Sequence, residues 1–255
     1  MILDRHDFLS FDTTRIAWHE LAPKSGAARP IILLHGLFSS GDMNWRKFGA
    51  AAEIAAAGYR VIMPDFRAHG QSAAPHEPAA YPADVLALDI EALVKHLDLS
   101  DFDLGGYSLG ARTVVRLLAR GMRPGRAILG GMGLAGITGG TERAAWFLNV
   151  IANAGSFKPG TAEHAAATFM QQNNIDGDAV ALVLRSQQAT TAAALQALET
   201  RTLVVCGVND QDNGAAGELA MALPNAALVE VPGNHMSAVT KPDFGTAIAA
   251  WLQHA

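Results

Sequence analysis

The sequence predicts an α/β fold: a mostly parallel sheet flanked by helices, with an inserted helical cap. Along most of the 255 residues, short apolar runs bounded by Gly and Pro alternate with helix-like runs that carry one apolar face. From Leu134 to about Leu198 this alternation stops, and Ala- and Gln-rich helical pieces follow one another. We therefore predict a core at residues 1–133 and 199–255, and a helical cap at 134–198.

Composition narrows the class of protein. Half of the residues are hydrophobic, 17% are charged and the net charge is -5, which favours a compact globular protein over a disordered or nucleic-acid-binding one. The single cysteine, Cys206, excludes an internal disulfide and lies in an apolar run. No signal-like apolar segment opens the chain, and no apolar run approaches the roughly 18–20 residues of a membrane span. We expect a cytoplasmic protein that binds neither nucleic acid nor membrane, in an oligomeric state that stays open.

The first part of the chain predicts an antiparallel start followed by parallel strands. Two alternating runs are joined by a short polar turn, as in a hairpin. The next run, Ile31 to Leu34, is wholly apolar, which is typical of a central strand buried on both faces. Gly58 and Pro64 end the following helix and strand. The elements expected here are strands at 6–12, 15–21, 31–34 and 60–63, and helices at 45–57 and 82–97.

The segment Gly106-Tyr107-Ser108-Leu109-Gly110 joins a β-like run from Asp101 to a helix-like run at 111–120. Gly-x-Ser-x-Gly between a strand and a helix is typical of a nucleophile elbow, a tight turn that lifts its central hydroxyl above the sheet. Such a turn leaves room only for small residues at Gly106 and Gly110. Because the helix begins at the turn, its free N–H groups face any negative charge that develops at Ser108.

Further strands are expected at 126–129, 202–206 and 226–231, with helices up to 223 and at 242–253. Sites in parallel α/β sheets lie beyond the carboxyl ends of the strands. Asp210 and Asp212 follow the penultimate strand and His235 follows the last, so that a serine, an acid and a base come in that order. His235 would take the proton of Ser108, and the N–H groups of Leu37 and Leu109 would bind the oxyanion.

Four segments together resemble the α/β-hydrolase superfamily, and within it the small bacterial carboxylesterases whose oxyanion loop reads His-Gly-Leu-Phe. The segments are His35-Gly36 after a buried strand, Asp65-x-Arg67-x-His69-Gly70-x-Ser72, the elbow, and Gly233-Asn234-His235. The resemblance implies an eight-stranded sheet, with no metal and no organic cofactor. Its usual Gly-x-x-Asp spacing falls on Gly207 to Asp210, which favours Asp210 as the acid, with Asp212 as the alternative. Epoxide hydrolases and haloalkane dehalogenases of this superfamily carry Asp at the elbow, whereas this chain has Ser108.

These observations predict a serine hydrolase that cleaves carboxylic esters of small to medium acyl chain through an acyl-enzyme. One alternative is a carbon–carbon bond hydrolase of ring-cleavage products, which a strongly basic pocket would favour. Another is a ligand-sensing receptor that keeps the triad but turns over very slowly. His35 and His69 are interpreted as structural. The candidate substrate-binding residues are Phe38, Tyr107, Trp146, Phe169 and Met236.

Overall fold

The computed structural model describes residues 4–23, 28–139 and 141–254. Its centre is an eight-stranded sheet in the order β1-β2-β4-β3-β5-β6-β7-β8. β2 pairs antiparallel with both β1 and β4, and the remaining neighbours are parallel, which confirms the predicted sheet and its antiparallel start. The strands are β1 (Asp4–Leu9), β2 (Arg15–Leu21), β3 (Arg29–Leu34), β4 (Tyr59–Pro64), β5 (Asp103–Tyr107), β6 (Arg126–Gly130), β7 (Arg201–Gly207) and β8 (Ala226–Val231).

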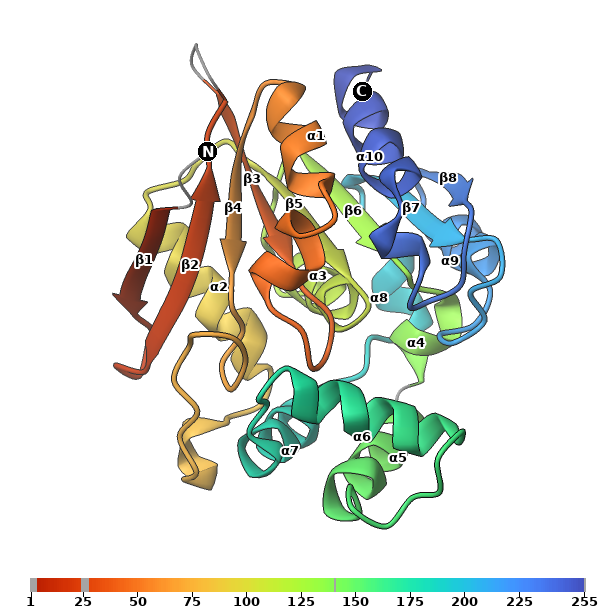
Figure 1. The fold of residues 1–255 in the computed structure, drawn as a ribbon. Coiled ribbons are helices and arrows are strands. Elements are labelled where there is room, and N and C mark those ends of the chain that lie inside the picture. The colour runs from red at the N-terminus through yellow and green to blue at the C-terminus, as the bar shows by residue number, and fades with distance from the viewer. Residues whose placement is uncertain (1–3, 24–27, 140, 255) are drawn as a thin grey trace.

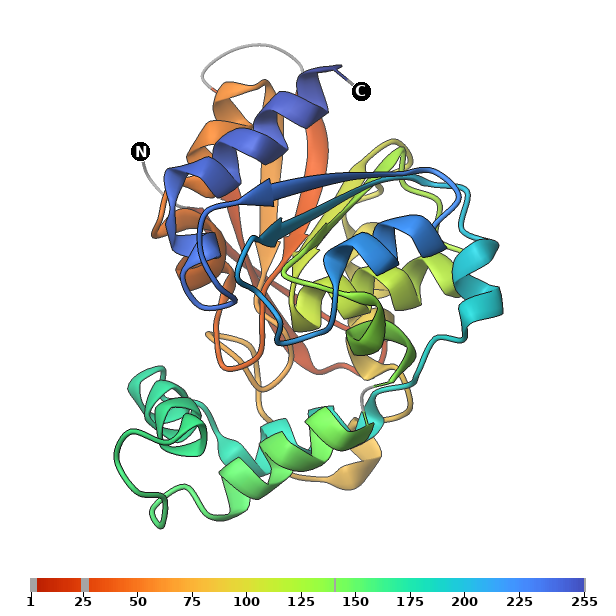
Figure 2. The ribbon, with the colours of Figure 1, turned by 90° about the vertical axis from the view of Figure 1, so that its right-hand side faces the viewer.

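Helices cover both faces of the sheet, α1 and α10 on one face and α2, α3 and α9 on the other (Figures 1 and 2). Their bounds are α1 (Ala50–Ala56), α2 (Val85–His96), α3 (Leu109–Ala119), α9 (Ala216–Ala222) and α10 (Pro242–His254), with short turns η1 (Asp42–Arg46), η2 (Pro78–Ala80) and η3 (Ala238–Thr240). The single helix predicted over 45–57 was wrong. The chain forms the π-helical turn η1 and then α1, because Gly49 between them adopts φ 91°, outside the helical region.

Five helices occupy the region between β6 and β7. They are α4 (Leu134–Thr138), α5 (Thr141–Ala152), α6 (Ala162–Gln172), α7 (Gly177–Ser186) and α8 (Ala192–Gln196). α5, α6 and α7 pack on one another in a layer at the bottom of Figures 1 and 2, while α4 and α8 pack against α3 and α9. The side chains of Thr161, Asp176 and Thr191 cap α6, α7 and α8 by accepting a backbone N–H. Within the described ranges no helix has the length and apolar character needed to cross a bilayer.

The β3 strand shows how the core is divided. Ile31 and Leu33 are fully buried on the side of α1 and α10, and Ile32 and Leu34 are fully buried on the side of α2 and α3. Each such side chain contributes about 1.5–3 kcal/mol relative to exposure to water. The apolar run at 31–34 is therefore a strand buried on both faces, as predicted. Because both faces of β3 are packed, the position of its carboxyl end is fixed. The loop that follows begins from that fixed position.

Candidate active site

The turn from β5 into α3 holds Ser108 in a strained backbone conformation, φ 53° and ψ −113°. Strain of this kind costs about 1–3 kcal/mol and persists only where the surroundings enforce it. Here the N–H of Ser108 donates to the Gly130 carbonyl at 2.8 Å. A Cβ at Gly106 would lie 2.2 Å from the backbone of Gly110, and one at Gly110 would lie 2.2 Å from the Leu34 carbonyl oxygen. Both glycines are thus required by space.

Ser108, His235 and Asp210 form one hydrogen-bonded chain. His235 Nε2 lies 3.0 Å from Ser108 Oγ, and His235 Nδ1 lies 2.8 Å from Asp210 Oδ2. Burial opposes ionisation of Asp210, but its hydrogen bond and charge interaction with His235 and the N–H of Asp212 hold its pKa below the usual value. The other candidate acid, Asp212, directs Oδ2 to Arg143 at 3.2 Å. An imidazole that contacts a serine hydroxyl on one side and an ionised carboxylate on the other is placed to act as a general base.

Two further side chains hold Asp210 and His235 in place through hydrogen bonds. The Cys206 thiol donates to Asp210 Oδ2 at 3.5 Å. Burial and the nearby Asp210 raise the pKa of Cys206 to about 12, so the thiol stays protonated and remains a donor. Tyr107 is buried, its hydroxyl donates to the His235 carbonyl at 2.5 Å, and its ring lies 5.4 Å from the imidazole. The sequence suggested Tyr107 for the substrate pocket, whereas its hydroxyl is directed at the backbone of His235.

Leu37 and Leu109, the predicted oxyanion donors, come from two different segments of the chain. Leu109 is the first residue of α3, so its N–H has no partner within the helix, and Leu37 follows the end of β3. Both residues line the cavity that contains Ser108. The loop that carries Leu37 is fixed at Gly36, whose N–H donates to Asn44 Oδ1 at 3.0 Å. His35 fixes it as well, since its Nε2 accepts the N–H of Phe66 at 2.9 Å.

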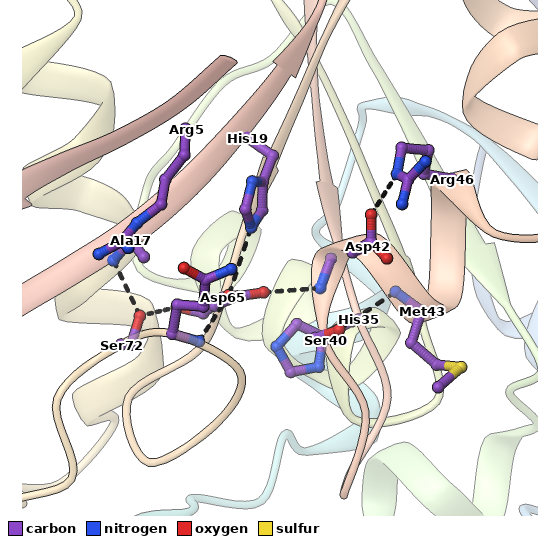
Figure 3. A network of polar contacts seen from close by, with 12 residues as sticks. Arg5, Ala17, His19, His35, Ser40, Asp42, Met43, Arg46, Asp65 and Ser72 are labelled. Carbon is purple, nitrogen blue, oxygen red and sulfur yellow. Dashed lines mark hydrogen bonds and ion pairs between the residues drawn. The ribbon is translucent and has the colours of Figure 1, made fainter. Parts of the chain in front are cut away.

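Asp65, the first residue after β4, links the loop that follows β3 to β2 and to the rest of its own loop (Figure 3). Its carboxylate accepts the N–H groups of Gly41 and Gln71, each at 2.8 Å, and lies 3.6 Å from His19 Nε2. Its carbonyl accepts the hydroxyl of Ser72, which in turn accepts the N–H of Ala17. Burial opposes ionisation of Asp65, yet these donors hold its pKa below the usual value. The donors to Asp65 thus hold together segments far apart in the chain.

His35 and His69 lie beside this network, with their ring centres 5.2 Å apart. Burial lowers the pKa of both, and that of His69 falls to about 3 with a further contribution from His35. His69 Nδ1 contacts the Arg67 carbonyl, and the Arg67 guanidinium is fully buried and pairs with Asp12 and Asp89. Neutral rings and a paired guanidinium therefore hold this loop in place.

A cavity of about 510 Å³ opens beside Ser108. The five candidate pocket residues are not in its lining. Phe38 packs edge-on against Phe147, Trp146 donates to Glu163 at 3.0 Å, Phe169 packs on the core, and Met236 is 57% exposed. The aromatic character of a side chain did not indicate which side chains between β6 and β7 line the cavity. The lining consists of Leu37, Ser108, Leu109, Arg112, Met132, Ala135, Gly136, Gly139, Glu142, Arg143, Ala144, Phe147, Leu184, Gln187, Asp212, Asn213 and Gly214.

Two polar members of this lining, Arg112 and Gln187, were absent from the sequence-based site. Arg112 lies four residues after Ser108 on α3, so one helical turn places it on the same side of the helix. That spacing was a signal for it in the sequence. Gln187 directly follows α7. Nothing in the sequence indicated that it lines the cavity, because its position depends on how α7 packs on α2.

Comparison with known proteins gives the same architecture. Residues 29–128 match a family model described as alpha/beta hydrolase fold. A putative non-heme chloroperoxidase from Synechocystis sp. is 39% identical over 95 residues, 37% of this chain and 33% of that protein. A putative esterase/lipase from Haemophilus influenzae is 35% identical over 89 residues, 35% of this chain and 29% of that protein. The matched segment thus spans about a third of the length of these relatives.

Solved structures match over nearly the whole chain. A hydrolase from Pseudomonas aeruginosa has a TM-score of 0.75 at 21% identity, with 98% of each chain covered. A thermophilic esterase from Thermogutta terrifontis, solved with malate bound, has a TM-score of 0.77 at 22% identity, with 98% of each chain covered. At these identities the likeness shows the fold. Together with the family model over residues 29–128 and the eight-stranded sheet, it shows that the chain has the α/β-hydrolase fold.

Proposed function

We propose that this chain is a serine hydrolase that cleaves carboxylic esters of small to medium acyl chain. The observation that carries the proposal is the hydrogen-bonded chain from Ser108 through His235 to Asp210 at the strained elbow. A serine hydroxyl is a weak nucleophile unless a base removes its proton as it attacks. His235 is in contact with that hydroxyl, and the ionised Asp210 holds the ring in place and would stabilise the positive charge that develops on it during proton transfer.

In the first half-reaction Ser108 Oγ attacks the ester carbonyl while His235 Nε2 takes the hydroxyl proton. The N–H groups of Leu37 and Leu109 would stabilise the oxyanion, and His235 then returns the proton to the leaving alcohol. This leaves an acyl group on Ser108. Water attacks it with His235 again as the base, which releases the acid and restores the serine.

The cavity supports this substrate class. Its volume, about 510 Å³, lies in the range of pockets that hold small molecules. Matched relatives include proteins named putative esterase/lipase, non-heme chloroperoxidase and epoxide hydrolase. Ester cleavage fits Ser108 better than epoxide hydrolysis does, because the epoxide hydrolases that this superfamily contains carry Asp at the elbow position.

The test is hydrolysis of a p-nitrophenyl ester series from acetate to laurate, with the wild type and Ser108→Ala measured side by side. We expect turnover that peaks at short to medium chains, and a loss of about 10⁶-fold in Ser108→Ala. Circular dichroism should show that both proteins are folded. A Ser108→Ala protein that keeps a substantial part of the wild-type rate contradicts the mechanism. No turnover of any ester by the folded wild type rejects ester hydrolysis in favour of carbon–carbon bond cleavage or ligand sensing.

A further inference from the structure

Three arginines at four-residue spacing follow Ser108 along α3, and they differ in their partners. Arg116 pairs with Asp84 at 2.7 Å and Arg120 pairs with Glu91 at 2.7 Å. Arg112 has no carboxylate partner among the residues that the structure describes, although it lies in the cavity wall. The arginine nearest to the proposed nucleophile is therefore the one whose charge is not paired.

Arg112 differs from the other charged residues of the cavity wall in its partners. Arg143 is paired with Asp212 at 3.2 Å, and Glu142 is exposed at the rim. Arg112 Nη1 donates to the Gly136 carbonyl at 2.7 Å, which fixes the guanidinium against α4. Its Nη2 makes only long contacts, 3.4 Å to the Gln188 carbonyl and 3.5 Å to that of Gly139.

The edge of the guanidinium formed by Nε and Nη2 is thus weakly engaged. Nε is buried and has no hydrogen-bond partner within the described part of the chain. Gln187, which shares the same wall, also has a buried amide nitrogen, Nε2, without a partner there. A buried donor without an acceptor is destabilising, so a wall with two of them favours a ligand that supplies acceptors. The Nε and Nη2 edge of a guanidinium matches the two oxygens of a carboxylate.

We propose that Arg112, assisted by Gln187, binds a carboxylate of the substrate, so that the esters cleaved at Ser108 are half-esters or acylated hydroxy acids. The inference rests on the proposed function and narrows its substrate class. Arg112 lies four residues after Ser108, about 6 Å along a helix axis, so the carboxylate belongs a few bonds from the scissile carbonyl. Burial and Arg116 lower the pKa of Arg112, yet a guanidinium stays charged at neutral pH.

The alternative is that these donors meet only water. A void of about 20 Å³ lies against Arg112, Arg116 and Gln187 and is large enough for a single water molecule. In that case the charge of Arg112 would only support α4, and neutral and anionic esters would be equivalent substrates. The two explanations therefore differ in a ratio that can be measured on the wild-type enzyme alone.

The experiment compares esters of equal length that differ in one carboxylate. Monoethyl glutarate against ethyl valerate tests the acyl side, and 4-acetoxybutanoate against butyl acetate tests the alcohol side, with acid release followed by pH-stat. We expect kcat/KM to be about 10- to 100-fold higher for the anionic member of at least one pair. In Arg112→Gln that preference should disappear, so that the two members of the pair have equal kcat/KM. Arg120→Gln removes the same charge from the same helix outside the cavity and should keep the preference.

Equal kcat/KM for both members of both pairs in the wild type overturns the carboxylate site and leaves ester hydrolysis standing. The same holds if Arg112→Gln keeps the full preference. No turnover of any of the four esters instead rejects the proposed function itself, so the two failures are distinguishable. Equal rates in the wild type overturn the site without any variant, and the Arg112→Gln result is interpreted only for a protein that circular dichroism shows to be folded.

Discussion

At the scale of single residues, the proposed catalytic centre depends on side chains outside the cavity lining. Tyr107 is an example, since its hydroxyl donates to the carbonyl of His235 and its ring also packs edge-on against Phe244. Removing the hydroxyl leaves a carbonyl with an unmet acceptor beside the base. The imidazole is then held only by its two side-chain contacts.

We predict that Tyr107→Phe lowers the free energy of unfolding by about 1–2 kcal/mol and lowers kcat several-fold with little change in KM. Urea unfolding and ester kinetics measure the two effects. Tyr59→Phe is the matched control, because Tyr59 also donates to a carbonyl, that of Leu252 at 3.1 Å, far from Ser108. It should lose stability and keep kcat. Equal effects of the two variants on kcat would mean that Tyr107 has no positioning role.

At the scale of elements, three backbone segments pack closely against one another at the elbow. β5, the start of α3 and the end of β3 approach so closely at Gly110 that an added Cβ would meet the Leu34 carbonyl oxygen at 2.2 Å. Backbone cannot move aside as a flexible side chain does. The position of Ser108 and the entry of α3 are therefore coupled to the packing of β3.

We predict that Gly110→Ala destabilises the fold by about 1–3 kcal/mol or more and abolishes most esterase activity, since α3 must shift away from β3. Gly155→Ala is the control. A Cβ there meets nothing within 4 Å, and we expect a change within about 0.5 kcal/mol. Thermal melts and p-nitrophenyl butyrate hydrolysis measure both. A Gly110→Ala protein with wild-type stability and rate would show that the elbow tolerates a side chain.

At the scale of the whole molecule, the sequence was informative where local pattern and backbone geometry agree. The run 31–34, the elbow glycines and the strand ends carrying Asp210 and His235 could all be read from short segments. The helix at 45–57 was misread because its apolar pattern continues through Gly49, which breaks it. The cavity lining could not be read, because it depends on how α5 and α7 sit over α3, and residue type does not determine that packing.

The buried histidines give the whole molecule a pH dependence with a definite sign. The pKa of His69 falls from 6.5 to about 3 because the ring is buried beside His35. Below about pH 6.5 the unfolded chain binds a proton that the folded protein does not bind until about pH 3. The unfolded state therefore binds more protons in this window, and stability falls with falling pH by up to about 1.4 kcal/mol per unit per histidine. Carboxylates with lowered pKa, such as Asp65 and Asp210, lose their contribution only below about pH 4.

We predict that the free energy of unfolding in urea declines from pH 7 to pH 4.5, and that His69→Gln flattens the decline, because Gln does not titrate. Only the slope is compared, because replacing a buried side chain also changes the stability at pH 7. His76 provides the control with the opposite sign: it is exposed, its hydrogen bond to Asp176 raises its pKa, and the folded state therefore binds the extra proton. His76→Gln should not flatten the decline. A His69→Gln slope equal to that of the wild type would mean that the buried ring gains its proton without global unfolding, through local opening of the loop that carries His69.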